Sequence, residues 1–212
     1  MHKYKSMTSR SKIRTFFNSK RKDFEYIEEY KKNKIFFNDL LQNGRREDIE
    51  FVLEIKISHY ISPLSNEGFY TEALTELEGI ENYLEKIRTH SKLYKLYVEA
   101  CIFQRGLCLG RLKRYKESNI EFAKLLEKHP TNDNFIDWYK TNKKKNFTRY
   151  SDLGATVGFG TFALILLIEF VNSDLHFPPK IRSYMLLIGV ISIVMPYIMD
   201  KIIDSEKIEI NK

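Results

Sequence analysis

The sequence predicts an all-α protein: an antiparallel helical-repeat stack over residues 23–147, followed by a two-helix transmembrane hairpin over residues 148–203. Two observations predict this organisation. Apolar residues recur with the period of a helix through the first segment, and no stretch alternates with the period of two that marks a strand. The second segment holds two long runs that are almost free of charge.

Residues 1–22 hold eight basic residues and no acidic one. We expect a flexible, solvated basic tail, or a tail that binds anionic lipid headgroups with Phe16 and Phe17 dipping into the interface. Contact with nucleic-acid phosphates and organelle targeting are weaker alternatives. Nucleic acid is an unlikely partner for the chain as a whole, because residues 23–139 carry 17 basic and 21 acidic side chains.

Helical periodicity continues from residue 21 to residue 147. A first helix is expected to stop at Asn43-Gly44 and a second at Ser62-Pro63, since glycine and proline end helices. The same pattern predicts four further helices separated by short connections, at about 69–88, 91–110, 114–128 and 133–147. Short connections between helices favour antiparallel neighbours.

One helix pair carries a more specific pattern. Bulky, small and aromatic residues stand at fixed spacings, with a proline at the end: Ile102, Gly106, Leu109, Tyr115, Ser118, Phe122, Leu125 and Pro130. In these spacings the chain resembles the tetratricopeptide (TPR) family. Upstream, residues 69–80 are similar to the second helix of a preceding repeat. The resemblance covers about 65 residues, and Pro63 makes the helix before them a poor match.

The TPR resemblance implies a concave surface that holds a peptide or protein segment. Its inner positions fall on Ala100, Phe103, Leu107, Gly110 and Arg111, and the candidate partner-binding residues among them are Phe103, Leu107 and Arg111. Family members that clamp a terminal carboxylate use lysine and asparagine at several such positions, whereas here Arg111 is the polar residue. We therefore expect an apolar or aromatic ligand segment. In the alternative interpretation, Phe103 and Leu107 pack against a neighbouring helix.

The C-terminal segment predicts the membrane hairpin. The first run, residues 153–171, has one charge in 19 residues, Glu169, and would form a helix about 28 Å long, close to the thickness of a bilayer's hydrocarbon core. The second run, residues 183–199, has no charge but contains Pro196. Nine residues that include two prolines, 172–180, follow the first run. Glu169 lies within a turn of the far interface, where we expect it to reach water.

The flanking charges predict the orientation. Lys143, Lys144, Lys145 and Arg149 precede the first span, whereas the connecting loop has Lys180 and Arg182. The positive-inside rule therefore places the N-terminal domain in the cytosol, and the hairpin returns the tail, residues 204–212, to the same side. These four residues are candidates for fixing topology or contacting lipid headgroups. We expect an integral membrane protein without a cleavable signal peptide.

Small residues recur along the two spans. Gly154 and Gly158 are four apart in the first, and Gly189 lies in the second, so all three are candidates for close helix packing. Packing within the hairpin and self-association between protomers are both consistent with this pattern.

No motif predicts catalysis, a cofactor or a metal. The five histidines lack the spacing of a zinc site, and no glycine-rich phosphate loop occurs. Cys101 and Cys108 are seven apart, too distant to bridge on one helix, and are expected to be buried thiols. We expect a protein that is not an enzyme.

Two functions fit these features. The first is a membrane-anchored TPR-like adaptor that binds a protein partner at the cytosolic membrane face, a plan similar to tail-anchored helical-repeat adaptors but with two spans. The second is a membrane-disrupting effector whose two spans oligomerise when the cytosolic helical domain senses a signal.

Overall fold

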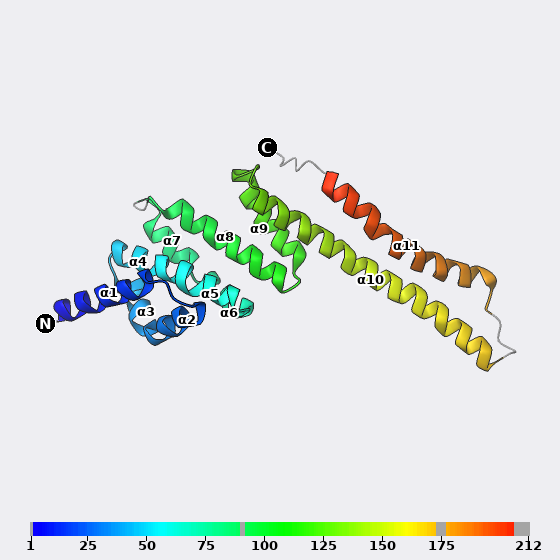
Figure 1. Cartoon of the computed structure of the whole chain (residues 1–212), viewed down its shortest axis with the longest axis horizontal. Helices are drawn as coiled ribbons and strands as arrows, with labels where there is room; N and C mark the ends of the chain where they lie inside the picture. The colour runs from blue at the N-terminus through cyan, green and yellow to red at the C-terminus, as the bar shows by residue number, and fades with distance from the viewer. Residues whose placement is uncertain (1, 90–91, 173–176, 206–212) are drawn as a thin grey trace. The chain divides into compact units, whose positions relative to one another are not determined.

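The computed structural model describes residues 2–89, 92–172 and 177–205, with side chains from residue 10 onward. All regular secondary structure in these residues is helical, which confirms the predicted all-α class. The chain divides into two compact units, residues 1–114 and 115–212. Figure 1 labels the helices of each unit.

The first unit is built from short and medium-length helices. Its elements are α1 (His2–Asn18), α2 (Asp23–Lys32), α3 (Lys34–Asn43), α4 (Arg46–Lys56), the π-helix η1 (Ile57–Ile61), α5 (Ser62–Asn66), α6 (Tyr70–Glu78), α7 (Glu81–Ile87) and α8 (Tyr94–Arg111). The predicted stop at Asn43 is found. The helix expected over 69–88 is instead two helices, α6 and α7, which are separated at Gly79-Ile80.

The core of this unit combines apolar side chains with a buried ion pair. Phe37, Leu53 and Leu64 are fully buried. Among them, the Lys56 ammonium lies 2.7 Å from a Glu76 carboxylate oxygen, and both side chains are largely buried. Lys34 also contacts Glu76, at 2.9 Å. These contacts connect α3, α4 and α6, since an interior charge is stable only when it is paired.

The basic segment 1–22 is not the flexible tail that we predicted. Residues 2–18 form α1, and the side chains of Ile13 and Phe17 are 5% and 2% exposed. The Phe17 ring stacks on Tyr26 at 5.9 Å, and the Arg10 guanidinium pairs with Asp48. Two apolar residues four positions apart give α1 a buried side despite the many cations.

The helix expected to end at Ser62-Pro63 continues through these residues. The π-helix η1 precedes them, and Pro63 lies in the first turn of α5. Proline removes a backbone donor and crowds the carbonyl four residues earlier. A local widening of the helix accommodates it, because π-turns shift the hydrogen-bond partners by one residue.

The second unit has three helices, α9 (Tyr115–Lys128), α10 (Asp133–Val171) and α11 (Pro179–Ser205). The predicted domain boundary at 147/148 falls inside α10, because no residue there breaks the helix. The Asn132 side chain caps its start by accepting a hydrogen bond from the Phe135 amide. Of the predicted tail 204–212, two residues belong to α11 and residues 206–212 lie outside the described residues.

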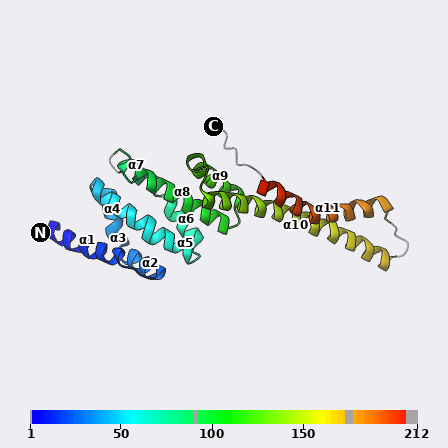
Figure 2. The ribbon, with the colours of Figure 1, turned by 45° about the horizontal axis from the view of Figure 1, so that its top comes forward.

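Helix α10 has two successive partners within this unit. Near its start, the Trp138 ring stacks on Phe122 of α9 at 5.8 Å, and the buried Asn142 side chain donates to Ser118 at 2.7 Å. Farther along, α10 and α11 run antiparallel, as Figures 1 and 2 show from two directions. The two C-terminal helices therefore form the expected hairpin.

Candidate membrane and partner-binding surfaces

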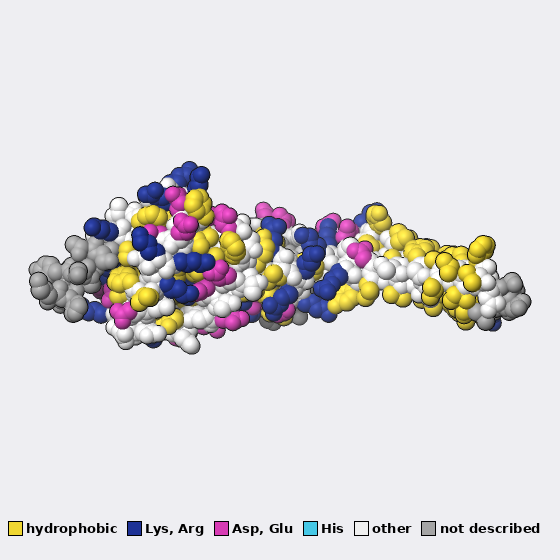
Figure 3. Space-filling model, turned by 90° about the horizontal axis from the view of Figure 1, so that it is seen from below, with side chains coloured by type: hydrophobic (Ala, Val, Ile, Leu, Met, Phe, Trp, Pro, Cys, Tyr) yellow, Lys and Arg dark blue, Asp and Glu magenta, His cyan; other side chains and the backbone are white. Residues whose placement is uncertain are grey.

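The hairpin exposes apolar side chains along most of its length. Both α10 and α11 are long and apolar enough to cross a membrane, yet only 11% of each apolar window is buried. Leu167 and Phe170 are 61% and 90% exposed, and Tyr197 is 74% exposed. Figure 3 shows hydrophobic side chains gathered over this part of the molecule. A core helix of a water-soluble protein would be mostly buried, so these helices lack a protein cover.

The contact between α10 and α11 depends on glycine. A Cβ atom at Gly158 would lie 2.6 Å from the backbone nitrogen of Gly189, and a Cβ at Gly189 would lie 2.8 Å from the Phe159 ring. A Cβ at Gly154 would lie 2.5 Å from the Ser192 hydroxyl. The three predicted packing glycines thus lie at contacts within one hairpin, where small residues let two backbones approach.

An ion pair closes the far end of the hairpin. A Glu169 carboxylate oxygen accepts hydrogen bonds from Arg182 at 2.6 Å and from the Phe177 backbone amide at 2.7 Å. The Glu169 side chain is 11% exposed. The sequence led us to expect a solvated Glu169, whereas the structure pairs it with Arg182 in the first turn of α11. Opposite charges on the two sides of a short loop were the available signal.

The basic cluster before the first span is partly engaged. Lys144 lies 2.8 Å from Asp204 near the end of α11, and this hydrogen bond raises the pKa of Lys144. Lys140 donates to the Asp204 carbonyl at 3.0 Å. Lys143 is half-buried, whereas Lys145 and Arg149 are exposed. Sequence reasoning missed Asp204, because its pairing depends on how the two helices align.

The predicted partner-binding residues follow one stripe of α8. Phe103, Leu107 and Arg111 are spaced by four, so they lie on one face of the helix. Phe103 and Leu107 are half-buried and Arg111 is exposed. The stripe offers two partly accessible apolar side chains and a cation beside them.

The two cysteines are the buried thiols that we expected. Burial raises the pKa of Cys101 to about 12, so its thiol stays protonated at neutral pH. The Cys108 sulfur lies 3.1 Å from the Ser65 hydroxyl. Neither environment activates a nucleophile, and among the described residues no group of three His, Cys, Asp or Glu side chains could hold a metal ion.

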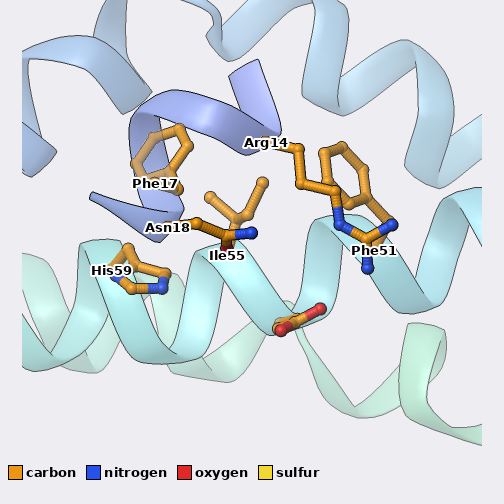
Figure 4. Close-up of a pocket in the computed structure, with 7 residues that line it drawn as sticks. Arg14, Phe17, Asn18, Phe51, Ile55 and His59 are labelled. Carbon is orange, nitrogen blue, oxygen red and sulfur yellow. The ribbon is translucent and has the colours of Figure 1, made fainter. Parts of the chain in front are cut away.

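A shallow hollow with a cavity volume of about 10 Å³ lies between α1 and the α4–η1 segment. Figure 4 shows Arg14, Phe17 and Asn18 on one side, and Phe51, Ile55 and His59 on the other. Burial lowers the pKa of His59, so its ring favours the neutral form. This volume holds about one water molecule and is far below that of ordinary small-molecule sites, about 300 to 1,000 Å³. The hollow marks incomplete packing beneath α1 rather than a ligand pocket.

Comparisons with known proteins give no relative. No protein-family model, curated protein or solved structure matches the chain.

Proposed function

We propose that the chain is a membrane-anchored adaptor. The α10–α11 hairpin lies in a bilayer, both ends of the hairpin face the cytosol, and the helical part binds a protein partner at that membrane face. The observation that carries this proposal is the single helix α10, which packs on α9 near its start and ends in an apolar stretch without a protein cover. An uninterrupted helix fixes the hairpin firmly to α9.

The TPR-like nature of the helical part belongs to the same proposal. Helix α8 ends at Arg111 and α9 begins at Tyr115, so the turn lies where the repeat pattern requires it. Gly106 is buried in α8. Ser118 and Phe122 are also fully buried, but against Asn142 and Trp138 of α10, so the support for the repeat comes from the position of the turn. The stripe Phe103, Leu107 and Arg111 is then the partner-binding surface. Its expected ligand is an apolar or aromatic protein segment.

A site-specific crosslinking experiment tests partner binding. A photo-reactive residue replaces Leu107 in the full-length protein in its own membrane, and a matched control places it at Ile120, which is 57% exposed on α9. We expect a discrete adduct with another protein from position 107, and a lower yield when Arg111→Ala is added. Equal adducts from both positions, or none from position 107, would contradict the binding surface.

The alternative, a membrane-disrupting effector that oligomerises through its spans, has less support. Gly154, Gly158 and Gly189 were the residues that suggested self-association, and all three are occupied by contacts within one hairpin. The Glu169–Arg182 pair likewise satisfies its charges within the chain. A homo-oligomer through the membrane helices would need another face of the hairpin.

A membrane-potential dye separates the two functions. Cells that express the full-length chain should keep their potential if the protein is an adaptor. Collapse of the potential, lost in a variant that disrupts the hairpin, would favour the effector.

A further inference from the structure

We propose that a basic surface at the N-terminus binds the anionic headgroups of the same bilayer that holds the hairpin. This basic surface consists of Lys12 on α1 and Lys20, Arg21 and Lys22 in the connection to α2, all four exposed. The inference rests on the proposed function, since it requires the hairpin to be in lipid. It gives the chain a second, electrostatic contact with the membrane.

The apolar side of α1 is packed against the rest of the first unit. As long as this packing is kept, α1 cannot insert its apolar side chains into the bilayer. Ile13 and Phe17 are buried. The Phe16 ring contacts Phe17 edge-on at 5.4 Å, and the Arg21 guanidinium covers it at 4.9 Å. The idea that Phe16 and Phe17 dip into the interface is therefore wrong for this structure. The contact with the bilayer that remains possible is between the cations of the basic surface and the lipid headgroups.

The described cations of α1 and of the connection to α2 divide into two sets. Arg10 pairs with Asp48 and its guanidinium lies 4.7 Å from the centre of the Phe51 ring. Arg14 lies over the same ring and lines the hollow beneath α1. These two arginines hold α1 on α4. Lys12, Lys20 and Lys22 do not line that hollow and are exposed, which leaves their charges directed to solvent or to a second surface.

The nearest acidic side chains in the sequence, Asp23 and Glu25, accept hydrogen bonds from neutral groups and keep their negative charge. Asp23 accepts a hydrogen bond from the Asn66 side chain at 2.7 Å. Glu25 accepts one from the Lys22 backbone amide at 2.9 Å, as part of the cap of α2. Residues 10–22 contain no acidic residue. The four cations of the basic surface outnumber these two carboxylates, so the surface remains net positive and its complement is an anionic surface.

An anionic lipid surface is a better candidate partner for the basic surface than nucleic acid is. The hairpin tethers the basic surface to a bilayer, so headgroups are present at high effective concentration and a weak contact suffices. Each lysine or arginine near an anionic membrane strengthens binding by about fivefold. Nucleic acid has no such tether, and the body of the chain is mildly acidic.

The test uses the full-length protein in lipid nanodiscs with a fluorescent dye on Ser11→Cys, since position 11 is exposed and the native cysteines are buried. Quencher lipids carry the quenching group either at the headgroup or deep in the acyl chain. We expect headgroup quenching in phosphatidylserine-containing nanodiscs and little in phosphatidylcholine alone. Raising the salt from about 0.1 M to about 1 M should reverse it, because the Debye length falls from about 10 Å to about 3 Å.

Matched variants assign the effect to the basic surface. Lys12→Gln/Lys20→Gln/Lys22→Gln should lower the docking equilibrium about 100-fold, about fivefold per charge. The control, Lys92→Gln/Lys95→Gln/Lys113→Gln, removes the same three charges from exposed positions of the same unit and should leave docking unchanged. Equal losses in both variants would reduce the effect to net charge and overturn the proposal.

Other outcomes overturn the proposal while sparing the adaptor function. Salt-resistant quenching from the acyl chain would show insertion of α1. Quenching only when separate anionic vesicles are added would assign the surface to a second membrane. Binding of duplex DNA by the same lysines, without lipid quenching, would assign it to nucleic acid. By contrast, failure of the chain to enter nanodiscs at all would contradict the proposed function itself.

Discussion

The two units of the chain use the same helical periodicity and place their apolar side chains in opposite environments. In residues 1–114, Phe37, Val52 and Leu53 are fully buried. In residues 115–212, Leu167 and Phe170 are largely exposed. Burial of apolar surface in water stabilises the first arrangement, whereas the second is stable only where the surroundings are themselves apolar. This difference is what the proposed function requires, with the first unit folded in water and the α10–α11 hairpin in lipid.

The largest expected effect comes from the same substitution made in each unit. Phe37→Ala removes a fully buried ring and should cost about 3–5 kcal/mol of unfolding free energy. Phe170→Ala, at a position that is 90% exposed, should change the stability little when the protein is in lipid. Urea titration of the full chain in nanodiscs, followed by proteolysis of each unit, measures both. Comparable losses of unfolding free energy in the two variants would contradict the difference between the two units.

The buried ion pair gives the next effect. Lys56→Met leaves Glu76 with Lys34 alone and should cost about 2 kcal/mol, below the full cost of breaking a buried pair because Lys34 remains. Lys56→Met/Glu76→Leu, which removes both charges, should recover much of this loss. Equal stability of the single variant and the wild type would show that the pair is dispensable.

The same pair predicts a pH dependence. Burial raises the pKa of Glu76, but hydrogen bonds from Lys56 and Lys34 outweigh it and hold the pKa below its ordinary value. The pair therefore stabilises the fold above the ordinary glutamate pKa, and this contribution is lost as the pH falls through the lowered value. Urea titrations between neutral and acid pH should show a smaller acid loss in Lys56→Met than in the wild type.

In the second unit, backbone approach replaces core packing as the sensitive feature. Gly158→Ile places side-chain atoms against the backbone of Gly189 and should weaken the hairpin by about 1–3 kcal/mol. Gly160→Ile is the control, since a Cβ there meets nothing within 4 Å. The rate of disulfide formation between Ser151→Cys and Ser192→Cys in lipid reports the separation of the helices. Equal rates in the two glycine variants would contradict the contact.

The smallest effect is expected at the exposed base of the hairpin. Asp204→Asn removes the partner of Lys144, and both side chains are accessible to water. Water and salt screen such a pair, so we expect no measurable change in hairpin stability. The same disulfide assay measures it. A change as large as that of Gly158→Ile would assign the pair a structural role.

The sequence predicted the features that depend on periodicity and composition. The all-α class, the stop at Asn43 and the two apolar runs follow from local patterns. The packing of α1 through Ile13 and Phe17 was not predicted. These two apolar residues lie among many cations, whose charges led us to predict a flexible tail. The passage of α10 across residue 147 follows from the absence of a helix breaker, although a change in composition at that point favoured a boundary.

Features that depend on how helices meet were beyond the sequence. The pairing of Lys144 with Asp204 requires the register of α10 against α11. The contact of Gly158 with Gly189 requires the same register. Small residues in both spans indicated close packing but did not distinguish contact within one chain from contact between chains.

The most direct measurement of the central claim is water accessibility at apolar positions that the structure leaves exposed. Leu167→Cys, in a Cys101→Ala/Cys108→Ala background in sealed vesicles, should resist a membrane-impermeant maleimide until detergent is added. Lys145→Cys and Ser205→Cys, at the base of the hairpin, should react from one and the same side without detergent. Rapid labelling of Leu167→Cys in intact vesicles would contradict the account, because those side chains would then lie in water.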